Sequence, residues 1–119
     1  MGTSSVNDAI LALRRRYAAS LPAKAAVAAE SVGALLAASE DSAVCETAHR
    51  ILHRLVGSAG TYGFPDLSRI ARSAEILLQE SLDTGVPLSP EGRLDLVNLT
   101  ARLGSLAASA AREAASGAA

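Results

Sequence analysis

Apolar residues recur along most of this chain at the three- and four-residue spacing of an amphipathic helix. No stretch of useful length alternates apolar and polar residues as a strand does. The clearest stripe lies between Pro65 and Leu82, with polar side chains on the opposite face. Its apolar members are Leu67, Ile70, Ala71, Ala74, Leu77, Leu78 and Leu82. The pattern therefore predicts a chain built from helices.

Proline and capping residues mark where these helices begin. Pro22, Pro65 and Pro90 each suit the first turn of a helix, where the N–H that proline lacks would have no partner. Ser89 precedes the last of them as a cap, and the Asp41-Ser42 pair can cap an earlier helix. The sequence predicts helices over residues 7–19, 22–38, 42–58, 65–82 and 90–114.

The helix predicted over residues 90–114 carries two families of apolar positions. The first family is Leu94, Val97, Ala101 and Ala108, and the second is Leu96, Leu99, Leu103, Leu106 and Ala110. Because the families lie on different faces, we expect this helix to bury a broad surface. The short helix over residues 7–19 carries an apolar stripe of Ala9, Ile10, Leu13 and Tyr17.

Short connections make successive helices antiparallel neighbours. We expect an all-α fold: an up-and-down antiparallel four-helix bundle with a short additional N-terminal helix. The 119 residues suit a single domain over 1–119, with residues 1–5 and 116–119 frayed. Hydrophobic residues make up 50% of the chain but aromatic residues only 3%, so Ala, Leu, Ile and Val must build the core.

The charge balance offers no general attraction to polyanions. The chain has 11 Lys and Arg residues against 12 Asp and Glu residues, so we expect neither a nucleic-acid partner nor a membrane partner. No segment reaches the roughly 18 consecutive apolar residues that a membrane span needs. A single cysteine, Cys45, suits a reducing compartment. We expect a monomeric, cytoplasmic protein.

Both histidines, His49 and His53, lie in the helix predicted over residues 42–58. The apolar face of that helix consists of Val44, Ala48, Ile51, Leu52 and Leu55. At roughly 100° per residue, His53 points away from this face to solvent. Gly57, one turn further on, has no side chain to cover the ring. An exposed neutral imidazole keeps a free ring lone pair, so His53 is a candidate nucleophile for a phosphoryl group.

Other chemistries lack the residues that they need. His49 and His53 have the i, i+4 spacing of two metal ligands, but only Glu46 lies near them, so no metal site is expected. Gly57 and its neighbouring glycines follow no strand, and no Gly-Lys-Ser/Thr appears, so no ATP site is expected. No nucleophile elbow accompanies Ser58, which argues against a hydrolase.

Two runs around the histidines carry a recognisable pattern: H-R-L-V-G-S-A-G-T-Y-G-F, from His53 to Phe64, and D-L-S-R-I-A-R-S-A-E, which ends at Glu75. Together they resemble the histidine-containing phosphotransfer (HPt) domain of multistep two-component phosphorelays. On that resemblance His53 corresponds to the phospho-accepting histidine and Gly57 to the glycine that leaves it accessible. The further matching positions are Leu55, Ser58, Ala59, Gly63, Leu67, Ala71 and Glu75.

The resemblance implies a phosphoryl carrier. His53 would accept a phosphoryl group from the aspartyl phosphate of a receiver domain and pass it to another receiver domain. The implied partners are response-regulator receiver domains, with a hybrid histidine kinase as a further candidate. The chain would need no cofactor and no kinase site of its own, because Mg²⁺ belongs to the partner receiver domain.

Two groups of residues are assigned around His53. The phosphoryl environment consists of Arg50, Arg54, Gly57 and Arg72. The three arginines could offset phosphoryl charge, and Gly57 leaves room for the group. The partner-docking surface consists of His49, Val56, Gly60, Arg69 and Ile76.

One position departs from the family pattern. The family commonly has lysine three residues after the phospho-accepting histidine, and this chain has Val56. Arg50, Arg54 or Arg72 could substitute, transfer could be slower, or a partner cation could take over. Val56 could equally add apolar docking area. Two alternatives therefore stay open: a module that docks receiver domains without accepting phosphate, and a plain helical interaction protein.

Overall fold

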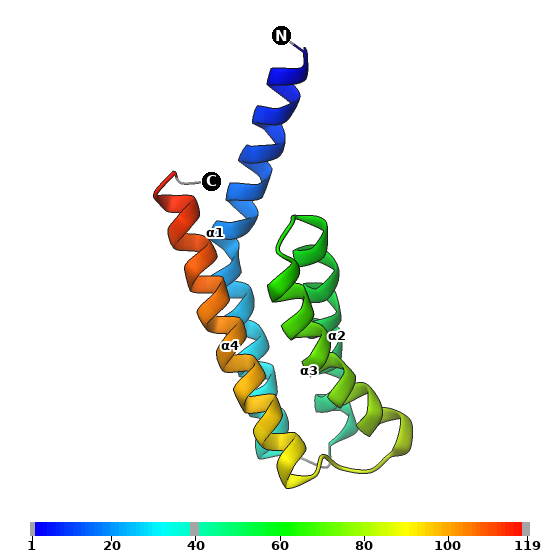
Figure 1. The fold of residues 1–119 in the computed structure, drawn as a ribbon. Coiled ribbons are helices and arrows are strands. Elements are labelled where there is room, and N and C mark those ends of the chain that lie inside the picture. The colour runs from blue at the N-terminus through cyan, green and yellow to red at the C-terminus, as the bar shows by residue number, and fades with distance from the viewer. Residues whose placement is uncertain (1, 39–40, 118–119) are drawn as a thin grey trace.

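The computed structural model describes residues 2–38 and 41–117, with side chains from residue 5 onward. Four helices follow one another in an up-and-down bundle (Figure 1). They are α1 (Gly2–Ala37), α2 (Ser42–Thr61), α3 (Pro65–Thr84) and α4 (Pro90–Ala115). The described residues contain no strand, so the all-helical bundle predicted from the sequence is confirmed.

α1 is one continuous helix through Pro22, so the prediction of a separate short N-terminal helix over residues 7–19 is wrong. Buried side chains continue at three- and four-residue steps on both sides of the proline: Tyr17, Leu21, Ala25, Ala28, Val32 and Leu35. A break at Pro22 would rotate half of this stripe away from the core. The retained burial offsets the roughly 3 kcal/mol that proline costs inside a helix.

The N-terminal part of α1 extends beyond the ends of the other helices (Figure 1). Ile10 and Leu13, which belong to the apolar stripe predicted for this segment, are 56% and 47% exposed. The sequence also predicted frayed ends. Residues 2–5 belong to α1 and residues 116–117 form a turn, whereas residues 1, 118 and 119 lie outside the described residues.

α2 and α3 form a hairpin whose turn depends on Gly63. α2 continues to Thr61, three residues past its predicted end at Ser58, so Gly57 and Gly60 lie inside the helix. Gly63 adopts φ +85°, a left-handed conformation that residues with a Cβ rarely take. The chain therefore reverses direction at the one glycine of this run that lies outside the helix.

The three Tyr and Phe residues gather where this turn meets α1. The rings of Tyr17 and Tyr62 stack with centroids 4.4 Å apart, and the Phe64 centroid lies 5.8 Å from that of Tyr17. The guanidinium of Arg14 lies 4.6 Å from the Phe64 centroid and donates to the Gly63 carbonyl at 3.3 Å. These contacts hold the hairpin turn against α1.

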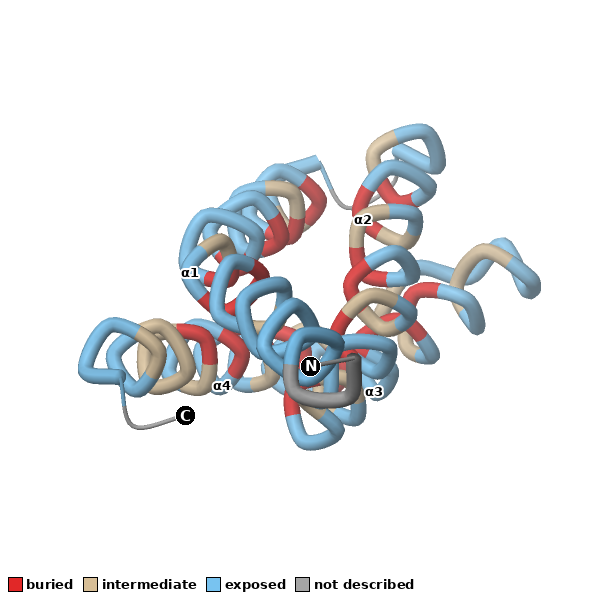
Figure 2. The backbone as a smooth tube through the Cα atoms, turned by 90° about the horizontal axis from the view of Figure 1, so that it is seen from above, coloured by how far each residue is buried: buried red, intermediate tan, exposed pale blue. Residues whose placement is uncertain are grey.

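The helices form two pairs, α1 with α4 and α2 with α3, which close into a bundle through α1–α2 and α3–α4 contacts (Figure 2). The largest fully buried side chains are Leu21, Leu52, Leu78, Leu96 and Leu103. A core of leucine and alanine is what the composition predicted. Among the described residues, no helix is both long enough and apolar enough to cross a membrane.

α4 buries only one of its two apolar families. Leu96 and Leu103 are fully buried, whereas Leu94 and Val97 are 61% and 45% exposed. The broad buried face predicted for this helix is therefore wrong, because α1 and α3 cover one side of α4 and leave the other uncovered. The predicted cap is confirmed, since the Ser89 hydroxyl accepts a hydrogen bond from the Gly92 N–H at 3.0 Å.

Candidate functional site

α2 presents His53 to solvent. The side chain is 71% exposed, while Leu52 and Leu55 on the other face of the helix are buried in the core. A Cβ placed on Gly57 would meet no atom within 4 Å. Packing within the bundle therefore does not require this glycine, and its effect is to keep the space beside the imidazole open.

Glu75 of α3 contacts the imidazole from the side of the bundle. Its carboxylate Oε2 forms a short contact with Nδ1 of His53, and the Glu75 side chain is only 11% exposed. The sequence assigned Glu75 no role in the site. A signal was present, because Glu75 lies on the buried face of α3 with Ala71 and Leu78, and a buried carboxylate needs a partner.

This contact decides which nitrogen of His53 is free. An ionised carboxylate only accepts hydrogen bonds, so Nδ1 of His53 carries the proton and donates to Glu75. The neutral ring then keeps its lone pair on Nε2. Glu75 thus fixes the tautomer in which the nitrogen remote from the carboxylate can act as a nucleophile.

His49 lies one turn before His53 and beside the same carboxylate. The two imidazole rings are nearly parallel, with an interplanar angle of 8° and centroids 6.2 Å apart. Nε2 of His49 lies 4.0 Å from Oε2 of Glu75, and its side chain is 22% exposed. His49, assigned to the docking surface from the sequence, is therefore largely covered and turned toward Glu75.

Val56 and Gly60 lie where α2 approaches α3. Val56 is half-buried against the core, and its carbonyl accepts a hydrogen bond from the Ser68 hydroxyl at 2.7 Å. A Cβ on Gly60 would lie 3.5 Å from the same hydroxyl oxygen. Little of Val56 is available to a partner, whereas Gly60 is exposed.

The arginines assigned to the site are exposed on both sides of His53. Arg50 and Arg54 lie on α2 and Arg72 on α3, and none of them forms an ion pair with a described residue. Arg69 pairs with Asp66 on its own helix. Ile76 is 54% exposed, as its position opposite the apolar stripe predicted. The structure thus brings Glu75, not a cation, against the imidazole.

A groove of about 370 Å³ runs between α1 and α2 on the side of α2 away from Glu75. It is lined by Ser20, Ala23, Lys24 and Val27 of α1 and by Ile51, Arg54, Leu55 and Ser58 of α2. Its floor is apolar, and Lys24 and Arg54 contribute a cation from each helix. Sequence reasoning missed this groove because its two walls are separated by more than twenty positions in the chain.

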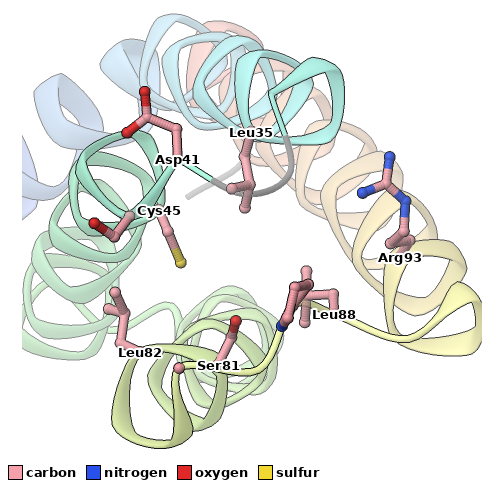
Figure 3. Close-up of a pocket in the computed structure, with 10 residues that line it drawn as sticks. Leu35, Asp41, Cys45, Ser81, Leu82, Leu88 and Arg93 are labelled. Carbon is pink, nitrogen blue, oxygen red and sulfur yellow. The ribbon is translucent and has the colours of Figure 1, made fainter.

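A second cavity, of about 360 Å³, lies at the end of the bundle near the start of α2 (Figure 3). Cys45 points toward it, and burial raises the pKa of the thiol, with a smaller contribution from Glu46. The polar lining is satisfied within the chain, since Arg93 donates to the Leu36 carbonyl at 2.6 Å and Ser81 to that of Val86 at 2.7 Å. We regard it as a packing gap beneath the connections.

In the described part of the chain, no three His, Cys, Asp or Glu side chains are arranged to hold a metal ion. A protein-family model described as "Hpt domain" matches residues 12–108. Neither the curated proteins nor the solved structures contain a match. The family match spans most of the chain and includes His53, Gly57 and Glu75.

Proposed function

Since the chain belongs to the Hpt domain family, whose members act in histidine phosphotransfer in phosphorelays, we propose that His53 is its phospho-accepting residue. In this proposal His53 receives a phosphoryl group from the aspartyl phosphate of one receiver domain and delivers it to another. The observation that carries the proposal is the contact between Glu75 and Nδ1 of an otherwise exposed His53.

The transfer step uses the lone pair on Nε2 of His53. This nitrogen attacks phosphorus, a P–N bond forms, the P–O bond to the aspartate breaks, and the aspartate leaves as a carboxylate. Nδ1 keeps its proton, and Glu75 stabilises the positive charge that the ring acquires. In the reverse step an aspartate of the next receiver attacks phosphorus, and the ring departs with its electron pair as a neutral imidazole.

Phosphoryl charge needs cations, and the side chain in contact with the His53 ring is a carboxylate. Arg50, Arg54 and Arg72 are exposed, and their long side chains can turn toward a phosphoryl group. Mg²⁺ on the receiver domain would supply the remaining charge. We propose that these groups together replace the family lysine, whose position is taken here by Val56.

Receiver docking involves the surface on both sides of His53. On the α3 side, the docking residues assigned from the sequence that are exposed are Gly60, Arg69 and Ile76, whereas His49 and Val56 are largely covered and border this surface. On the α1 side, the apolar groove with Lys24 and Arg54 suits a helix that presents apolar side chains with acidic neighbours. The cytoplasmic location and a hybrid-kinase partner stay predictions from the sequence.

Phosphotransfer is tested by mixing the protein with phosphorylated receiver domains. We expect an acid-labile, alkali-stable phosphate on the wild-type chain and none on His53→Gln. His49→Gln is the matched control, because it makes the same change one turn away, and it should still be labelled. Undiminished labelling of His53→Gln would overturn the assignment.

A second candidate function, docking without phosphate acceptance, is favoured by Val56. It predicts that phosphorylated receiver domains bind the chain but never label it, under conditions in which another HPt domain is labelled. Val56→Lys restores the family cation and should speed labelling severalfold if charge neutralisation limits the step. Labelling of the wild-type chain would exclude this candidate.

A further inference from the structure

The exposed apolar family of α4 follows a strict heptad spacing. Leu94, Val97, Ala101, Gly104 and Ala108 succeed one another at steps of three, four, three and four residues. Leu94, Val97, Ala101 and Gly104 are exposed, and a Cβ on Gly104 would meet no atom within 4 Å. This spacing is the one that two helices use when they pack along each other. We call these five residues the outer seam of α4.

The outer seam lies away from the proposed phosphotransfer site. It belongs to α4, which pairs with α1, whereas His53 belongs to the α2–α3 pair (Figure 2). A glycine inside an exposed helix costs about 1 kcal/mol relative to alanine, and nothing within the bundle needs the space above Gly104. Neither the fold nor phosphotransfer explains this seam.

We propose that the outer seam is the interface of a homodimer, in which α4 of one copy packs antiparallel against α4 of the other about a two-fold axis near Ala101. This assembly goes beyond phosphotransfer and differs from the monomer expected from the sequence. It leaves His53 of both copies exposed, because the seam and the histidine lie on different helix pairs.

Side-chain size makes the seam complementary to itself. The large residues, Leu94 and Val97, lie before Ala101, and the small residues, Gly104 and Ala108, lie after it. Antiparallel pairing about Ala101 sets the large half of one copy against the small half of its partner, and the symmetry repeats this contact. Glycine and alanine also let the two backbones approach closely.

The polar residues that flank the seam favour the same orientation. Glu91, Asn98, Ser105 and Arg112 follow one edge at seven-residue spacing, and all four are exposed. Antiparallel pairing about Ala101 brings Glu91 next to Arg112 of the second copy and Asn98 next to Ser105, whereas parallel pairing would place these edges on opposite sides of the dimer and leave Glu91 without Arg112 as a neighbour. Neither Glu91 nor Arg112 forms an ion pair with a described residue.

α1 extends the surface by a short uncharged edge. Pro22, Ala26, Ala29 and Gly33 are exposed on the edge of α1 opposite the groove that faces α2, and this edge is the one next to α4. A strip about 10 Å wide over about 33 Å of α4 and about 17 Å of α1 gives a footprint of roughly 500 Å². Stable interfaces bury about 800 Å² per partner and weak ones less than about 600 Å², so the size of this face fits a weak dimer.

Sedimentation equilibrium of the full chain, from about 1 μM to about 1 mM, tests the proposal. We expect a monomer–dimer equilibrium with a dissociation constant in the micromolar range. Gly104→Leu should raise this constant at least about tenfold. It cannot act by unfolding the monomer, since the added side chain meets open space within one copy and leucine is the better helix former.

Charge reversal tests the orientation. Glu91→Lys and Arg112→Glu should each weaken the dimer, and the double variant should regain most of the wild-type affinity. Asp95→Lys is the matched control, because this exposed residue lies on the flank of α4 away from the seam, and it should leave the constant unchanged. A wild-type chain that stays monomeric throughout, or a Gly104→Leu chain with unchanged affinity, overturns the proposal.

Discussion

The two flanks of His53 differ in kind. On the α3 flank, the buried carboxylate of Glu75 meets Nδ1 of the imidazole and fixes its tautomer. On the α1 flank, an apolar groove rimmed by Lys24 and Arg54 offers surface but no contact with the ring. The comparison separates two tasks: α3 prepares the nucleophile, and α1 and α2 together offer an area where a partner can bind.

The largest expected effect follows from removing the carboxylate. Glu75→Leu should slow phosphoryl transfer to His53 roughly 100-fold, because Nδ1 loses its acceptor and the ring can adopt the other tautomer. Glu75→Gln keeps an oxygen that accepts from Nδ1–H and should lose much less. Single-turnover labelling from a phosphorylated receiver measures both rates.

A spectroscopic readout separates this role from a structural one. ¹⁵N chemical shifts of the His53 ring should report protonation on Nδ1 in wild type and Glu75→Gln, and a mixture of tautomers in Glu75→Leu. The fold should tolerate leucine, because an apolar side chain suits a position between Ala71 and Leu78. Equal transfer rates in all three proteins would contradict a role for the α3 flank in the chemistry.

An intermediate effect distinguishes the flanks as docking surfaces. Val27 in the groove and Ile76 on α3 are 51% and 54% exposed, so they form a matched pair. Val27→Glu should weaken receiver binding about tenfold and Ile76→Glu about threefold, because the groove offers the more concave apolar surface. Isothermal titration calorimetry gives both affinities, and circular dichroism checks that helicity is retained. A larger loss for Ile76→Glu would move the main docking surface to α3.

The smallest effect concerns how the α1 flank is held to α2. The Tyr17 hydroxyl lies 2.7 Å from the Ser58 hydroxyl, and burial raises the pKa of Tyr17 above its ordinary value of 10.0, opposed in part by this hydrogen bond. A raised folded-state pKa means that the stabilisation is complete below pH 10 and is lost as the pH rises through the folded value.

Urea unfolding measures this dependence. Tyr17→Phe should lower the free energy of unfolding by about 1 kcal/mol at neutral pH. Between pH 9 and about pH 11 its stability should fall less than that of wild type, because the titrating hydroxyl is gone. The pKa of Cys45 is also raised, but this thiol is present in both proteins and cancels in the comparison. If the free energy of unfolding fell equally with pH in both proteins, ionisation of Tyr17 would not be linked to folding.

Residue spacing within single helices predicted several features of the fold and of the candidate site. The stripe from Leu67 to Leu78 fixes which face of α3 is buried, since that depends only on spacing within one helix. The same argument directed His53 outward, and the motif around it led to the family that the match over residues 12–108 establishes. The break predicted at Pro22 is wrong, because the buried stripe on both sides of the proline stabilises one continuous helix by more than the proline costs.

The sequence by itself determined that this chain forms helices, that His53 faces solvent beside Gly57, and which family it belongs to. These properties depend on spacing and side-chain type within a single segment. Only the tertiary structure decided that Glu75 meets His53, that α1 and α2 enclose a groove, and that one apolar family of α4 stays exposed. Each of these depends on which helix packs beside which, and spacing within one helix carries no information about its neighbours.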